Sequence, residues 1–212
     1  MKNEFFKRLL SSIILIPVAL FCIIKGSLIF IIFISTCFLI IFYEWHKMSK
    51  KKSYYILGFI FLFFSFFTVY KLRINPENDY WFFLFITIIC VSTDIGGYAF
   101  GKLFKGPKLT KLSPNKTYAG MLGGYILSLI SITIFTNDMS IKGESLINWF
   151  VFVVIVSSVS QLGDITISYY KRLSKIKNTG KIIPGHGGVL DRVDGMIFAF
   201  PFSYIILLMD FL

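Results

Sequence analysis

The sequence predicts an all-α fold: a polytopic integral membrane protein with about seven transmembrane helices. Of its 212 residues 56% are hydrophobic, above the roughly 45–50% that is usual in soluble domains. The excess falls in long blocks separated by short basic loops, as expected for membrane-spanning helices. No polar stretch is long enough to bury a core of its own, so we expect no separate soluble domain.

The first apolar block follows Lys7-Arg8 and resembles a signal peptide. No small-residue cleavage site follows it, and a second apolar run begins at once, so we interpret the block as a retained first helix. Several blocks are short for a hydrocarbon core of about 30 Å, and we expect their helices to extend into the flanks. The candidate spans are 9–24, 27–43, 54–70, 81–101, 118–136, 147–170 and 195–211.

The net charge of +11 is distributed unevenly over the loops. In a soluble protein it would indicate a nucleic-acid partner, but here the charge follows membrane orientation, and no nucleic-acid partner is expected. Lys25, Lys71, Arg73 and Lys142 fall in one set of alternate loops, and the other 18 of the 22 basic residues lie in the opposite set. The positive-inside rule then predicts an inside N-terminus and an outside C-terminus.

Four aspartates stand out because carboxylates are rare in membrane spans. At about 1.5 Å per residue, Asp94 and Asp164 would both lie roughly 20 Å from the outer face, near the basic loops. Asp191 and Asp194 begin the last span on the same side. A lone charge at such a depth costs at least about 2.5–3.5 kcal/mol. Oxygen ligands with few competing His or Cys residues favour Mg²⁺, with one ion or two. The alternative is that each aspartate pairs with a nearby lysine for structure alone.

The helical spacing groups these residues further. Asp164, Ser168 and Lys171 follow the i, i+4, i+7 pattern of one helix face, and Asp191 and Asp194 follow i, i+3. A basic loop begins at Lys171 and Arg172, directly after the sixth span.

Two short segments are candidate phosphate sites. The turn from Pro184 to Gly188 could bring backbone N–H groups close to phosphate oxygens, although it lacks the spacing of a P-loop. Alone it could be an ordinary turn, with His186 a surface residue. In the second segment Ser113 is predicted as an N-cap with Pro114 in the first turn, and such a helix start binds anions. An ordinary capped helix is the alternative.

Two groups of motifs resemble the phosphatidate cytidylyltransferase family. One is Ser168-x-x-Lys171-Arg172 followed by the stretch from Pro184 to Asp194, which reads PGHGGVLDRVD. The other is the stretch from Asp94 to Tyr98, DIGGY, followed by Ser113 to Thr117, SPNKT. They cover most of residues 93–195, whereas the N-terminal third matches only as hydrophobic helices, with a faint echo at Tyr43-Glu44-Trp45.

The resemblance implies an enzyme that joins CTP and phosphatidic acid to give CDP-diacylglycerol and pyrophosphate. It implies Mg²⁺ on Asp164 and Asp191, with Asp194 and Asp94 as further candidate ligands, and catalytic roles for Lys171 and Arg172. The enzyme is expected in a bacterial inner membrane with its site facing the cytoplasm, and a homodimer is its candidate assembly. The expected substrate-binding residues are Ser113, Asn115, Lys116, Thr117, Ser168, Gly185, His186, Gly187, Gly188 and Arg192.

On this interpretation residues 1–80 form a scaffold of helices. Residues 81–212 form the catalytic region, with cytoplasmic loops 102–117 and 171–194. The sequence departs from the family pattern at Ile167, Asn178 and Ala119. A transporter for an anionic substrate is the alternative function, and a CDP-alcohol phosphotransferase is disfavoured because its DGxxAR motif is absent.

The charge asymmetry yields a direct test of topology. Reporter fusions at Lys52, Lys105 and Lys177 should read inside, and a fusion at Lys142 should read outside. An outside reading at Lys177 would contradict a cytoplasmic site.

Overall fold

The structure is a computed structural model, and the residues it describes exclude several short segments. It describes residues 2–74, 79–110, 113, 116–135, 146–185 and 187–209, without the side chains of 2–5, 7–9, 79 and 134.

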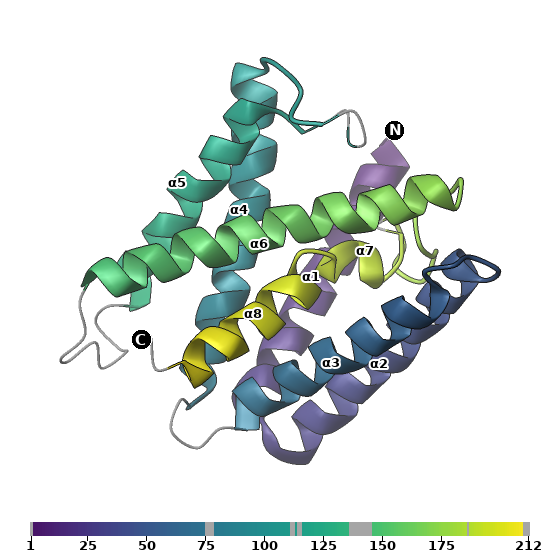
Figure 1. Cartoon of the computed structure of the whole chain (residues 1–212), viewed down its shortest axis with the longest axis horizontal. Helices are drawn as coiled ribbons and strands as arrows, with labels where there is room; N and C mark the ends of the chain where they lie inside the picture. The colour runs from purple at the N-terminus through teal and green to yellow at the C-terminus, as the bar shows by residue number, and fades with distance from the viewer. Residues whose placement is uncertain are drawn as a thin grey trace. The chain divides into compact units, whose positions relative to one another are not determined.

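The described chain consists of helices joined by loops, and the predicted all-α class is confirmed (Figure 1). Each of the seven predicted spans corresponds to a helix, and one further turn of helix, α7, was not predicted. The helices are α1 (Lys2–Lys25), α2 (Ser27–Ser49), α3 (Tyr55–Ile74), α4 (Asp79–Phe104), α5 (Tyr118–Phe135), α6 (Leu146–Leu173), α7 (Leu190–Val193) and α8 (Met196–Leu208).

Four helices in the described part of the chain are long and apolar enough to cross a membrane: α2, α3, α4 and α6. The other apolar helices, Leu10–Lys25, Tyr118–Thr133 and Met196–Leu208, are shorter. The chain is therefore an integral membrane protein by its helices, while the count of about seven spans stays a prediction.

The chain divides into two compact units. The first unit contains residues 1–80 and 170–194, and the second contains residues 81–169 and 195–212. Helix α6 runs continuously across the boundary between residues 169 and 170.

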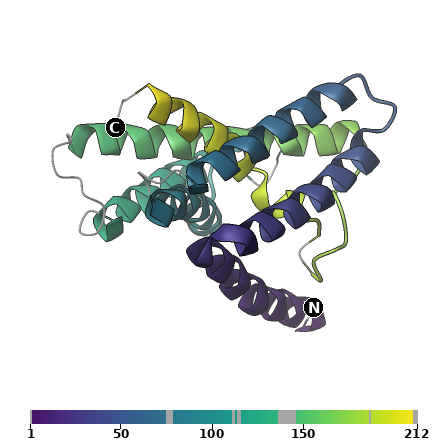
Figure 2. The ribbon, with the colours of Figure 1, turned by 90° about the horizontal axis from the view of Figure 1, so that it is seen from below.

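In the first unit, α2 packs against α1, α3 and α7. Both views show α2 and α3 side by side as an antiparallel pair (Figure 2). Aromatic rings fill this contact, with the rings of Phe38 and Phe66 4.9 Å apart and those of Phe42 and Phe59 4.0 Å apart. Helix α2 continues six residues beyond the predicted end at residue 43, so Glu44 lies inside the helix.

Arg73, one of the four basic residues on the sparse side of the charge count, caps a helix in the same unit. Its Nε donates to the carbonyl of Ile23 at 2.7 Å, and a terminal nitrogen donates to Ile24 at 3.3 Å. These carbonyls belong to the last turn of α1, where a positive charge is favourable. A structural contact therefore accounts for this exception to the charge asymmetry.

In the second unit, α4 and α5 approach each other through glycines. A Cβ atom at Gly96 would overlap the carbonyl oxygen of Gly123, and one at Gly120 would come within 2.6 Å of the carbonyl oxygen of Gly97. Small residues at a helix contact allow this close backbone approach.

Alanine substitutions at the neighbouring glycines Gly96 and Gly97 of α4 should therefore have different effects on the melting temperature. Gly96→Ala should lower the melting temperature in detergent, because overpacking costs about 1–3 kcal/mol. Gly97→Ala is the matched control, since its Cβ would meet only the Gly120 carbonyl at 3.8 Å, an ordinary contact. Alanine should be neutral or slightly stabilising there, because it forms helix better than glycine by about 1 kcal/mol. Equal melting temperatures for the two variants would contradict the packing.

Candidate active site

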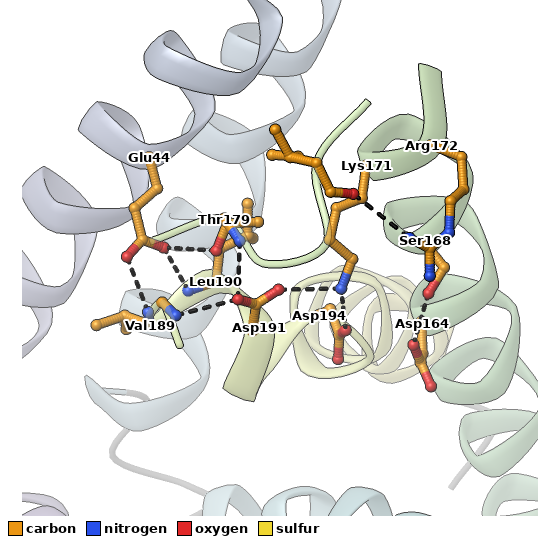
Figure 3. A network of polar contacts seen from close by, with 12 residues as sticks. Glu44, Asp164, Ser168, Lys171, Arg172, Thr179, Val189, Leu190, Asp191 and Asp194 are labelled. Atoms are coloured by element: carbon orange, nitrogen blue, oxygen red, sulfur yellow. Dashed lines mark hydrogen bonds and ion pairs between the residues drawn. The ribbon is translucent and has the colours of Figure 1, made fainter. Parts of the chain in front are cut away.

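The loop that follows α6 is closed by the carboxylate of Asp191. Its Oδ2 accepts the backbone N–H of Thr179 at 2.8 Å and that of Gly188 at 3.0 Å, while Oδ1 accepts Lys171 Nζ at 3.0 Å (Figure 3). The Asp191 side chain is only 4% exposed. Asp191 thus ties two loop segments and the end of α6 to the start of α7.

Lys171 contacts two carboxylates at once. Its Nζ lies 3.0 Å from Asp191 Oδ1 and 3.9 Å from Asp194 Oδ2. The predicted i, i+3 pairing of the two aspartates on one face is confirmed, since both face the same cation. The two carboxylates therefore converge on one position of positive charge.

Glu44 of α2 holds the same loop from a second side. Its carboxylate accepts the N–H of Val189 at 3.0 Å, the N–H of Leu190 at 2.9 Å and the hydroxyl of Thr179 at 3.0 Å. Glu44 is 1% exposed. Val189 and Leu190 begin α7, so the carboxylate satisfies N–H groups that a helix start leaves without partners.

Sequence reasoning placed Glu44 in the scaffold and missed this contact. The signal was present: Glu44 is a single carboxylate near the end of a long apolar helix, and such residues are rarely without function. It was overlooked because the predicted span stopped one residue before it.

The glycine turn is a closed structure. Ile183 and Gly187 exchange two backbone hydrogen bonds, of 2.9 and 3.2 Å, and Gly185 and Gly187 have φ of +76° and +93°. A Cβ at Gly187 would lie 2.8 Å from Asp191 Oδ2, and one at Gly188 would overlap Thr179 and the Glu44 carboxylate. The N–H groups of Gly187 and Gly188 are donated within the loop, so packing accounts for these glycines; their predicted contact with phosphate stays a prediction.

In the second unit, Asp164 of α6 pairs with Lys116. Its Oδ2 lies 2.5 Å from Lys116 Nζ, and its Oδ1 accepts the hydroxyl of Ser168 at 3.3 Å. The contact with Ser168 confirms that these two residues share a helix face. Both carboxylates at the centre of the prediction, Asp164 and Asp191, are therefore paired with lysines, as the structural alternative expected.

The predicted N-cap at Ser113 is wrong. Helix α5 begins at Tyr118, and Thr117 caps it by accepting the N–H of Gly120 at 3.1 Å. The preceding chain folds back on itself, with the N–H of Leu109 donated to Lys116 at 2.7 Å. The carbonyl of Ser113 instead accepts the N–H of Lys116 in a turn. Helix α5 starts only after the backbone contact between Leu109 and Lys116 ends.

Arg172 and Asp94, two further residues predicted for the site, lie on exposed positions of their helices. Arg172 donates to the carbonyl of Ile176 at 3.5 Å. Asn115 and His186 lie outside the described residues. Among the residues that the structure describes, no cluster of three or more His, Cys, Asp or Glu side chains forms a metal site by itself.

Comparison with known proteins agrees with these motifs. The model of the cytidylyltransferase family matches residues 6–71 and 49–210. The phosphatidate cytidylyltransferase of Rickettsia bellii is 32% identical over 212 residues, covering 97% of this chain and 91% of that protein. The enzyme of the same name from Rickettsia typhi is 33% identical over 207 residues, covering 94% and 90%. That of Haemophilus influenzae is 36% identical over 132 residues, covering 60% and 46%. The aspartates, lysines and glycine turn of this integral membrane chain all fall in the region that the family model matches. The chain therefore belongs to the cytidylyltransferase family.

Proposed function

We propose that the chain transfers the cytidylyl group of CTP to phosphatidic acid, giving CDP-diacylglycerol and pyrophosphate for phospholipid biosynthesis. The names of the relatives support this substrate pair. The observation that carries the proposal is Lys171, whose ammonium is held by two carboxylates beside a tightly closed glycine turn. Membership of an enzyme family sets aside the alternative of a transporter.

The reaction needs little help from a strong base. The phosphate monoester of phosphatidic acid is already anionic, and its oxygen attacks the α-phosphorus of CTP. The bond from that phosphorus to the bridging oxygen breaks, and pyrophosphate leaves with the electron pair. Alignment and charge stabilisation are therefore the main requirements. Lys171, Lys116 and Arg172 would stabilise the phosphate charges, and Ser168, Thr117 and Arg192 would orient the substrates.

We further propose that Mg²⁺ is held by Asp164 and Asp191, with Asp194 and Asp94 as additional candidate ligands. The chemistry of the donors fits, because carboxylate oxygens are the ligands that Mg²⁺ prefers. Asp191 and Asp194 already converge on one cation, the ammonium of Lys171. When bound, the ion would neutralise oxygens of the triphosphate. The pairing of Asp164 with Asp191 rests on the motif order and on the shared face of Asp164, Ser168 and Lys171.

We propose that this chemistry takes place on the cytoplasmic side of a bacterial inner membrane. Two features support it: the uneven charge of the loops and the bacterial relatives. Phosphatidic acid would then enter from the bilayer and CTP from the cytoplasm. A pyrophosphate-release assay with CTP and phosphatidic acid in mixed micelles, with and without a chelator, tests the function directly.

Replacing the two central aspartates tests the metal assignment. Asp164→Asn and Asp191→Asn should each lower turnover at least about a hundredfold, because metal-assisted catalysis contributes several kcal/mol and each 1.36 kcal/mol is about tenfold. The double variant should be little worse than either single variant, since residues that act as one unit are not additive.

Asp138→Asn, in a predicted outer loop, is the control and should match the wild type. The measurement is pyrophosphate release as a function of Mg²⁺ concentration. Near-normal turnover of both single variants at limiting Mg²⁺ would refute the shared ion, and strictly additive losses would indicate independent roles.

The glycine turn allows a matched comparison. Gly187 and Gly106 both have positive φ, +93° and +98°, so alanine costs backbone energy at either position. Only Gly187 is crowded, because its Cβ would press against Asp191, whereas nothing lies within 4 Å at Gly106. Gly187→Ala should therefore lower kcat or raise the KM for CTP at least about tenfold more than Gly106→Ala. Equal kcat and KM values for the two variants would mean that the glycine turn only connects its flanking segments and has no role in the reaction.

A further inference from the structure

We propose that Glu44 is a positioning residue that fixes Asp191 and the glycine turn for the reaction. The inference rests on the proposed function for its kinetic consequence, but its structural part stands on contacts within the first unit alone. The family resemblance includes Glu44 only in the faint echo at Tyr43-Glu44-Trp45 and assigns it no role.

Glu44 and Asp191 divide one set of donors between them. Thr179 gives its N–H to Asp191 and its hydroxyl to Glu44. On the facing segment Gly188 gives its N–H to Asp191, while the next two residues, Val189 and Leu190, give theirs to Glu44. The two carboxylates thus bind the same two loop segments through alternating contacts, and moving one would move the donors of the other.

The three donors to Glu44 are uncharged, and the carboxylate is nearly completely buried. A buried carboxylate is stable only when its oxygens are well satisfied, so the loop must keep its N–H groups aimed at Glu44. Two glycines make room for this approach. A Cβ at Gly180 would overlap Glu44 Oε1, and one at Gly188 would overlap both carboxylate oxygens or press closely on them.

Glu44 touches neither substrate nor metal in this scheme, so its effect must pass through Asp191 and the turn. Helix α2 carries the carboxylate, and the loop segments that it binds come 135 to 146 residues later in the chain. The helix therefore acts as a fixed support for the loop, and the N-terminal helices contribute to the site rather than serving only as scaffold.

Two substitutions of Glu44 distinguish the effect of its charge from the effect of its side-chain length. Glu44→Gln keeps the shape of the side chain, but it replaces one carboxylate oxygen with an NH₂ group. That group cannot accept a hydrogen bond from the loop's donors. Glu44→Asp keeps the charge but is one methylene too short to reach the same donors. Both should lower kcat/KM at least about tenfold, the loss expected from a charge-assisted hydrogen bond. Tyr55→Phe, which removes the 2.7 Å contact with His46 on the same helix, is the control and should retain activity.

Hydrogen exchange followed by mass spectrometry on the detergent-solubilised chain tests positioning without substrate. The amides of Val189 and Leu190 should exchange at least about tenfold faster in both Glu44 variants, because Glu44 is their acceptor. The amides of Thr179 and Gly188, which donate to Asp191, should also exchange faster if Glu44 fixes the position of the loop. Those amides should keep the wild-type rate in Tyr55→Phe. If Glu44→Gln fails to fold, Thr179→Val provides the milder perturbation, and Thr179→Ser should restore the wild-type exchange and kinetics.

Faster exchange in this loop together with reduced kcat/KM supports the proposal. Unchanged exchange, or faster exchange with wild-type kcat/KM, overturns it. A wild-type chain that releases no pyrophosphate from CTP would contradict the proposed function alone, because the exchange experiment still decides whether Glu44 fixes the loop.

Discussion

The loop after α6 depends on the hydrogen bonds that two buried carboxylates accept from its backbone. Among the described residues from Thr179 to Leu190, which exclude His186, there is little regular structure apart from one two-residue bridge at the glycine turn. Buried N–H groups without acceptors are costly, so Asp191 and Glu44 supply the acceptors that a helix or sheet would otherwise provide. Asp191 also accepts Lys171 Nζ and the N–H of Gly188, so the same carboxylate joins the end of α6 and the glycine turn to this loop.

The helices were largely predictable because apolar blocks leave a strong signal. The errors came at the ends. Helix α2 continues through His46 and Lys47 because nothing in that segment breaks a helix, although its apolar run has ended. The predicted span for α5 began correctly at residue 118, but its N-cap was placed at Ser113 because Ser before Pro is a common helix start. Thr117 is an equally good cap and follows the folded-back segment.

Within the site, local spacing predicted local contacts. Ser168 and Asp164 are four residues apart and do meet, and Asp191 and Asp194 do face one cation. The pairing of Lys116 with Asp164 joins residues 48 positions apart, and spacing carries no information about it. The partners of Glu44 were harder still to predict, because most of them are backbone N–H groups. Every residue except proline has such a group, so the sequence does not show which ones Glu44 contacts.

The contact between Glu44 and Leu190 also constrains the order of events during synthesis. The two residues are 146 positions apart, so at about 5–20 residues per second α2 is complete for roughly 7 to 30 s before its partner segment exists. During that interval the carboxylate has none of its three final donors and needs water as its hydrogen-bond partner. Glu44 lies near the end of α2 rather than in its middle, and a charged side chain costs less near the end of an apolar helix than at its centre. The contact that fixes the loop is therefore completed only after Thr179, Val189 and Leu190 have been synthesised.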